Sequence, residues 1–126
     1  MGLTYVTVAL KALGKKNKPY EASFLVDTRA TDSLAPTADL IRAGIKPAGK
    51  MIYELADGTL QEYDFGLAEI AFMGERTAGR VIFGPDNAEP LWGVTALESV
   101  GVTVDPANRA LKRLPAIPLK VIRRKR

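Results

Sequence analysis

The dipeptide Asp57-Gly58 constrains the fold more than any other short feature of the sequence. It stands between two runs with strand-like alternation, residues 51–55 and 59–67. Asp-Gly favours the tight turn of a β-hairpin because both residues tolerate positive φ angles. The sequence therefore predicts an antiparallel hairpin of about residues 51–66 with a two-residue turn, and a mainly β fold is the first expectation.

Turn residues and short apolar runs continue this pattern along the rest of the chain. Short helices are predicted at residues 36–44 and 94–100, because Pro36 suits a first helical turn and Gly44 and Gly101 suit the position just past a helix end. The remaining strands are expected at residues 3–10 and 20–26, at 66–73 and 77–83 around Gly74-Glu75, and at 102–104 and 110–114 around the turn 105–108.

The amino-acid composition excludes several kinds of chemistry. The 126 residues suit one domain with a core of useful size. The sequence contains no cysteine and no histidine, which excludes disulfides, thiolate nucleophiles and Ser-His pairs. We therefore expect no metal and no cofactor, and any catalysis must use carboxylates, hydroxyls, lysines or arginines.

The positive net charge of +4 comes from the C-terminal end of the sequence. The last seven residues, KVIRRKR, contain five of the 18 basic residues and no acid, so 13 bases face 14 acids elsewhere. We expect a domain over residues 1–119 and a basic, solvated tail over residues 120–126. Nucleic-acid binding is not the expected function, because the body is not basic. The sequence suggests neither a signal peptide nor a membrane span, which favours the cytoplasm.

The stretch FLVDTRATDSLAP, residues 24–36, places a carboxylate directly after an apolar strand. Taken alone, Asp27 suits a helix cap or a turn. Two later segments change this interpretation: Pro90-Leu91-Trp92-Gly93 precedes the second helix, and Ala56-Asp57-Gly58-Thr59 lies between the two. Residues 24–36 resemble the active-site loop of the retroviral-type (retropepsin-like, clan AA) aspartic proteases, residues 56–59 their flap, and residues 90–93 their second hallmark. The three features also follow one another along the chain in the family's order. The likeness covers roughly residues 3–115 and is greatest to the bacterial single-domain members.

The resemblance implies a fold and a mechanism. The expected fold is the mainly β acid-protease barrel with one or two short helices. Asp27 is the expected catalytic residue, and Thr28 the residue that braces the loop across a dimer. Because the chain has one Asp-Thr pair of this kind, the two aspartates of the family mechanism require a homodimer, which hydrolyses a peptide or protein substrate with an activated water.

Arg29 departs from the family pattern, which is Asp-Thr-Gly. A glycine leaves room for substrate beside the carboxylate, whereas an arginine fills that room with a permanent charge. If Arg29 reaches Asp27, it favours the ionised carboxylate and opposes the sharing of one proton by two aspartates. If Arg29 turns outward, the dyad survives. The alternative function is a catalytically silent peptide-binding module with the protease fold.

Further side chains are candidates for substrate contact. Asp32 suits the capping of a turn equally well, and Tyr53 and Leu55 suit packing within the hairpin equally well. Trp92 is expected in the core rather than in the site. The candidate substrate-binding residues are Ala30, Thr31, Asp32, Tyr53, Leu55, Ala56, Asp57 and Gly58.

Overall fold

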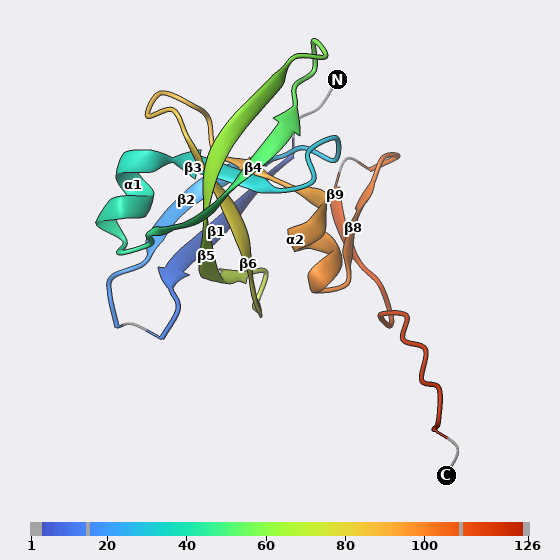
Figure 1. Ribbon diagram of the computed structural model, residues 1–126. Helices are drawn as coiled ribbons and strands as arrows, with labels where there is room; N and C mark the ends of the chain where they lie inside the picture. Colours follow the sequence, from blue (N-terminus) through green and yellow to red (C-terminus); the bar gives the residue numbers. More distant parts are fainter. Residues whose placement is uncertain (1–3, 15, 109, 125–126) are drawn as a thin grey trace.

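The computed structural model describes residues 4–14, 16–108 and 110–124 (Figure 1). The predictions for Leu3 in the first strand and for Lys125 and Arg126 in the tail lie outside these residues. Strands dominate, which confirms the mainly β prediction. The elements are β1 (Tyr5–Ala12), β2 (Tyr20–Val26), β3 (Ser33–Pro36), α1 (Thr37–Arg42), β4 (Pro47–Glu54), β5 (Leu60–Phe72), β6 (Glu75–Gly84), β7 (Leu91–Trp92), α2 (Val94–Ser99), β8 (Val102–Asp105) and β9 (Ala110–Arg113).

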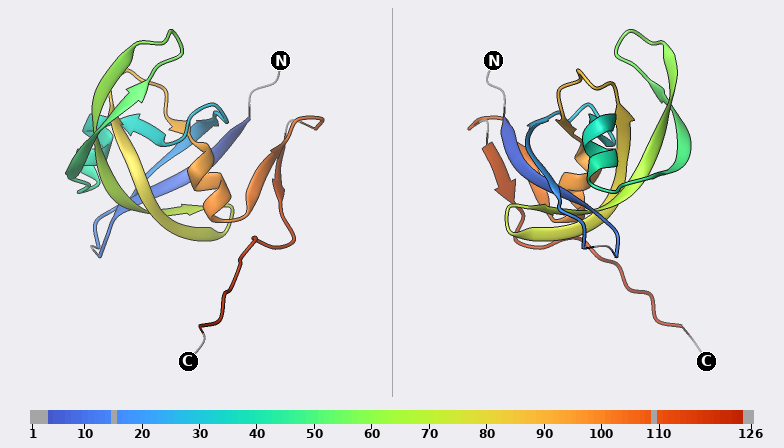
Figure 2. Two further views of the ribbon diagram at one scale, coloured as in Figure 1. Left: turned by 45° about the vertical axis from the view of Figure 1, so that its right-hand side comes forward. Right: turned by 90° about the vertical axis from the view of Figure 1, so that its left-hand side faces the viewer.

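Seven of the strands form one sheet that closes on itself. Their order is β1-β2-β7-β3-β6-β5-β4, and β1 also pairs antiparallel with β5. This second pairing closes a barrel of all these strands except β4, which extends the sheet beyond β5. The β8–β9 hairpin forms a separate two-stranded sheet beside α2 (Figure 2).

The barrel interior is filled by alternate residues of the strands. In β1, Val6, Val8 and Leu10 are buried and the residues between them are more exposed, as expected for side chains that alternate across a strand. Trp92 is fully buried at the centre. Its ring meets Phe24 and Phe72 edge-on, with centroid distances of 5.4 and 5.0 Å. The prediction that Trp92 belongs to the core is correct.

The predicted hairpin is formed by β4 and the first half of β5, and it projects from the barrel in Figure 1. Its turn is not the expected two-residue loop. The Gly58 amide donates to the Leu55 carbonyl and the Leu55 amide to the Thr59 carbonyl, and of Asp57 and Gly58 only Gly58 has a positive φ angle, 86°. This is a three-residue loop in which glycine takes the left-handed position.

The second half of the barrel differs from the sequence prediction at β5. A break was expected near residue 66, but β5 runs unbroken through Gly66. A Cβ atom there would lie 2.8 Å from the Ile45 side chain, so Gly66 allows close packing rather than a turn. The following turn falls at Met73-Gly74, whose φ angles are 53° and 77°, and not at Gly74-Glu75. A methionine at positive φ is uncommon, so the prediction from the sequence placed the turn one residue too late.

Both predicted helices are present but shorter than expected. Gly44 and Gly101, at φ angles of 84° and 73°, follow α1 and α2 as predicted. Pro36 does not lie in the first turn of α1; it is the N-cap residue and the last residue of β3. The sequence missed β3 and the two-residue β7, because segments this short carry no detectable alternation.

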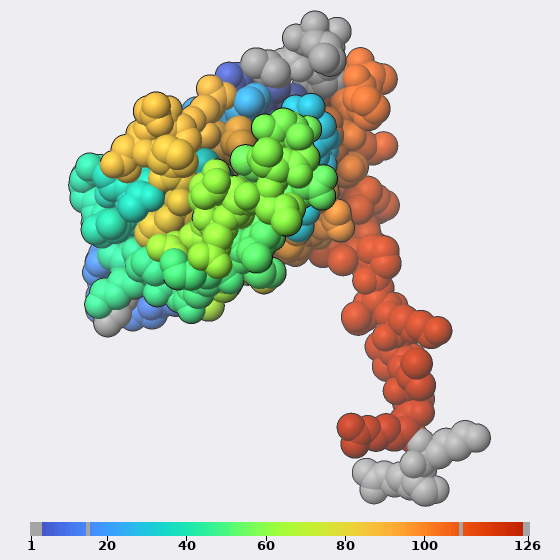
Figure 3. Space-filling view, turned by 45° about the horizontal axis from the view of Figure 1, so that its top comes forward, coloured from blue at the N-terminus to red at the C-terminus, as the bar shows by residue number. Residues whose placement is uncertain are grey.

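The C-terminal segment leaves the body of the molecule after β9. Figure 3 shows it projecting from the barrel. Leu119, Val121 and Ile122 have 87%, 74% and 78% of their surface exposed, more than any other large apolar residues that are described. Within the described part of the chain, none of the helices is both long and apolar enough to cross a membrane.

Candidate active site

Asp27 lies at the point where two parallel strands end together. β2 pairs in parallel with β7, with Val26 opposite Trp92. The Asp27 amide donates to the Trp92 carbonyl at 3.0 Å, so the backbone of the candidate catalytic residue is attached to the core. The Asp27 side chain retains 25% of its surface exposed. The apolar run ends at Asp27 because the chain leaves the barrel wall there.

The loop after Asp27 interlocks with the start of α2. The amides of Val94 and Thr95 donate to the carbonyls of Ala30 and Thr31 at 2.9 and 3.1 Å, which satisfies N–H groups that a helix start leaves without intrahelical partners. The Gly93 amide donates to the Ser33 hydroxyl at 2.9 Å. A Cβ atom on Gly93 would lie 2.6 Å from the backbone of Asp32. Two of the three segments that carry the family resemblance therefore meet, and Gly93 is needed where they meet.

Arg29 contacts Asp27 within the same chain. Its backbone amide donates to Asp27 Oδ1 at 3.0 Å, and its Nε lies 3.3 Å from the same oxygen. Of the two orientations considered from the sequence, this is the one in which the guanidinium reaches the carboxylate. The Arg29 side chain is 88% exposed, so solvent screens the pair strongly.

Asp32 joins the loop to the β4–β5 hairpin. The Tyr53 hydroxyl donates to Asp32 Oδ2 at 2.6 Å, and Arg80 Nε lies 3.8 Å from that oxygen. The Arg80 guanidinium in turn stacks over the Phe65 ring, 4.7 Å from its centroid. The structure thus brings together Asp32 and Tyr53, which the sequence named separately.

Arg80 is a residue that the sequence analysis missed. It lies on β6, directly before the buried run Val81, Ile82 and Phe83. A cation next to three buried residues could have indicated a paired charge, but its partner, Asp32, is too distant in the sequence to be identified from spacing.

A groove lies between the Asp27 loop and the hairpin. Its volume is about 370 Å³. Of the predicted site residues it contains Arg29, Ala30, Thr31, Asp32, Tyr53 and Leu55. Asp27, Thr28, Ala56, Asp57 and Gly58 do not line it. Asp57 instead accepts hydrogen bonds from the hydroxyl and the amide of Thr59. The hydroxyl bond first, and the amide bond second, lower the pKa of the Asp57 carboxyl, and both order the hairpin turn.

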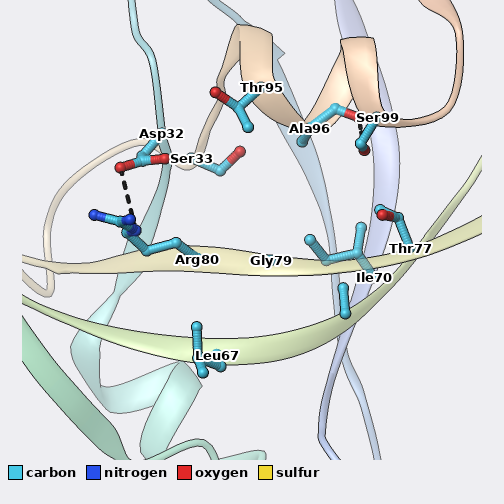
Figure 4. Close-up of a pocket in the computed structure, with 11 residues that line it drawn as sticks. Asp32, Ser33, Leu67, Ile70, Thr77, Gly79, Arg80, Thr95, Ala96 and Ser99 are labelled. Carbon is cyan, nitrogen blue, oxygen red and sulfur yellow. Dashed lines mark hydrogen bonds and ion pairs between the residues drawn. The ribbon is translucent and has the colours of Figure 1, made fainter. Parts of the chain in front are cut away.

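Two further cavities lie near the site. Thr28 lines one of about 410 Å³ beside α2, β8 and Ile117. Figure 4 shows the other, of about 230 Å³, between α2 and the sheet formed by β5 and β6, with the Asp32–Arg80 pair at one side. Asp32 lines both this cavity and the groove. Across residues 4–14, 16–108 and 110–124, no group of three acidic, histidine or cysteine side chains is placed to hold a metal ion.

Tyr53 is expected to ionise late in an alkaline titration. Burial, followed by the hydrogen bond to Asp32, raises the pKa of Tyr53 from 10.0 to about 12. Because the folded-state pKa lies above the unfolded-state value, the stabilisation is complete below pH 10 and is lost as the pH rises toward 12. After a discount for solvent screening, we expect a loss of about 1–2 kcal/mol in the free energy of unfolding.

The raised pKa of Tyr53 is measured by titrating the phenolate absorbance of the parent and of Tyr53→Phe. The variant keeps the ring, and the difference between the two titrations isolates Tyr53 from Tyr20, whose pKa burial also raises. Identical late phases in the two proteins would contradict the assignment.

Comparisons with known proteins found a likeness among solved structures. Neither a protein-family model nor a curated protein matches the sequence. The structure is similar to the solution structure of a simian foamy virus (mac) protease, with a TM-score of 0.49 and 16% sequence identity, over 71% of this chain and 87% of that chain.

Proposed function

We propose that two copies of this chain form a retropepsin-like aspartic peptidase to which each copy contributes Asp27. The observation that carries the proposal is the placement of Asp27 at the shared end of β2 and β7, in a loop interlocked with Gly93 and facing a groove beneath a hairpin. The Asp27 carboxylate is partly exposed, and the loop that follows it, residues 29–32, lines the groove. A carboxylate held at the start of such a loop suits acid–base catalysis.

In the proposed mechanism the two aspartates share one proton. Their like charges oppose full ionisation of the pair. One carboxylate takes a proton from water as the water oxygen attacks the peptide carbonyl carbon, and the other donates its proton to the carbonyl oxygen. The resulting tetrahedral gem-diol then collapses: the C–N bond breaks, the leaving nitrogen takes the proton that the first carboxylate gained, and one hydroxyl returns its proton to the second carboxylate. Thr28, next to Asp27, braces the loop against its counterpart. Arg29 restrains this chemistry, because its guanidinium contacts the Asp27 carboxylate and occupies space where water and substrate must approach.

The C-terminal segment adds support for a dimer. Leu114, Ile117, Leu119, Val121 and Ile122 are all exposed, and a run of exposed apolar residues is typical of an interface. We keep residues 1–119 as the peptidase domain and residues 120–126 as a basic tail.

A silent peptide-binding module is the second candidate function. The contact of Arg29 Nε with Asp27 Oδ1 favours it, because the same contact that restrains hydrolysis leaves the groove available.

Chain mixing tests the shared site. In an Arg29→Gly background, an excess of chains that also carry Asp27→Asn should suppress peptide hydrolysis, because most active chains would then pair with an inactive one. An equal excess of chains carrying Asp39→Asn is the control; Asp39 lies on α1 and pairs with Arg42. Sedimentation should show a dimer. A strict monomer at high concentration, or hydrolysis that falls equally with both added chains, would rule out a site built from two chains.

A further inference from the structure

The guanidinium of Arg29 has hydrogen-bonding capacity that its contact with Asp27 does not use. The contact is made through Nε, at 3.3 Å. Within the described residues, Asp27 is the one carboxylate within ion-pair distance of Arg29. Arginine presents five N–H donors in a planar fork, so the outer edge formed by Nη1 and Nη2 can donate two parallel hydrogen bonds to a carboxylate.

The geometry of the existing pair allows a ligand to compete for this side chain. A single N–H contact in a side chain that is 88% exposed is strongly screened by solvent and contributes little to holding the side chain in place. A bidentate carboxylate makes shorter, charge-assisted bonds of defined direction. An incoming carboxylate can therefore occupy the outer edge, or draw the guanidinium away from Asp27, at small cost.

The groove beside Arg29 defines what else the ligand must carry. Its lining includes Leu34, Ile52, Ile82 and Leu91 together with the rings of Tyr53 and Tyr63. Asp32 is already engaged by Tyr53 and Arg80. An apolar side chain therefore suits the groove, and a carboxylate suits its Arg29 edge.

We propose that Arg29 binds a peptide carboxylate next to an apolar residue held in the groove, so that the ligands of this site are acidic-apolar peptides. This inference rests on the proposed function and names its ligand class. The carboxylate comes from a glutamate or aspartate side chain or from the peptide C-terminus, since both offer the same two oxygens. Glu54 also lines the groove, and its like charge opposes such a ligand.

Peptide binding, rather than hydrolysis, tests the inference. Three labelled, N-acetylated peptides share one apolar core containing phenylalanine. The first has a glutamate beside it and an amidated end, the second has glutamine and an amidated end, and the third has phenylalanine as its last residue with a free C-terminal carboxylate. Fluorescence anisotropy is measured with full-length Asp27→Asn protein, in which cleavage is not expected.

The expected result is about tenfold tighter binding of one carboxylate peptide over the amidated glutamine peptide, the scale of one charge-assisted contact. Adding Arg29→Gly should remove the preference. Adding Arg42→Gly should not, because Arg42 is a similarly exposed, ion-paired arginine that does not line the groove. Adding Glu54→Gln should strengthen binding of the carboxylate peptide.

Each outcome separates this inference from the proposed function. Equal affinity for all three peptides, no measurable binding of any, or a preference that survives Arg29→Gly would overturn it. A preference for the carboxylate in a protein whose Arg29→Gly variant hydrolyses nothing would support the inference and count against the peptidase. Whichever of the two carboxylate peptides binds more tightly shows whether a side chain or the peptide C-terminus supplies the carboxylate that Arg29 binds.

Discussion

Replacing Arg29 by glycine is expected to raise peptide hydrolysis near neutral pH by roughly a hundredfold, which is within the range that one acid–base group contributes. The substitution removes the guanidinium whose Nε lies 3.3 Å from Asp27 Oδ1, on the carboxylate that the proposed peptidase uses to activate water. It also clears space beside the carboxylate, where substrate and water must approach.

Cleavage of a diverse peptide library from acidic to neutral pH measures this effect. Asp27→Asn in the Arg29→Gly background should abolish the gain, since it removes the base and keeps the shape. Arg42→Gly is the control for loss of an exposed arginine elsewhere. The comparison of parent and Arg29→Gly is made at each pH, so that the effect of the guanidinium is read at matched conditions.

Two results would contradict this account of Arg29. If the parent already cleaves as fast as Arg29→Gly, the contact with Asp27 does not restrain catalysis. If the parent, Arg29→Gly and Asp27→Asn are equally inactive on the library, the peptidase proposal fails and the peptide-binding module remains.

The predictions that succeeded rest on local chemistry. The β2 strand was predicted with its observed bounds, Tyr20–Val26, because an apolar run meets a polar loop at Asp27. Gly44 and Gly101 mark helix ends because their backbones adopt positive φ angles, which glycine tolerates. Such features depend on one residue and its neighbours, so a single sequence reveals them.

The predictions that failed concern features set by distant parts of the chain. β3 exists because it pairs in parallel with β6, nearly 50 residues later, and nothing within Ser33–Pro36 indicates that partner. The turn at Met73 follows from the register between β5 and β6, which overrides the residue's own preference. In the candidate site, the hydrogen bond from Tyr53 to Asp32 and the pairing of Arg80 with Asp32 likewise depend on how the hairpin folds over the loop.

Trp92→Ala is expected to lower the free energy of unfolding by about 3–5 kcal/mol, the usual cost of deleting a large buried aromatic side chain. Trp92 is fully buried between Phe24 and Phe72, and its removal would leave a cavity that the closed barrel cannot readily collapse. Denaturant unfolding followed by far-UV circular dichroism measures the change, since Trp92 is the one tryptophan of the chain and its fluorescence is lost in the variants.

Trp92→Phe shows how much of the loss in unfolding free energy comes from losing the aromatic packing. It keeps an aromatic ring against Phe24 and Phe72, and it removes an indole N–H that has no hydrogen-bond partner among the described residues. The expected order of stability is therefore parent, then Trp92→Phe by a small margin, then Trp92→Leu, then Trp92→Ala. If Trp92→Ala unfolds too readily to measure, the phenylalanine and leucine variants still test this order, and equal stability of those two would contradict it.

The same series tests how the core holds the candidate site. The Asp27 amide is bound to the Trp92 carbonyl, so a backbone shift caused by the cavity would move the carboxylate directly. In the Arg29→Gly background, Trp92→Phe should retain hydrolysis, and Trp92→Leu should lose more activity than its fraction of unfolded protein explains. Activity that follows only the folded fraction would show that the packing of Trp92 stabilises the barrel without positioning Asp27.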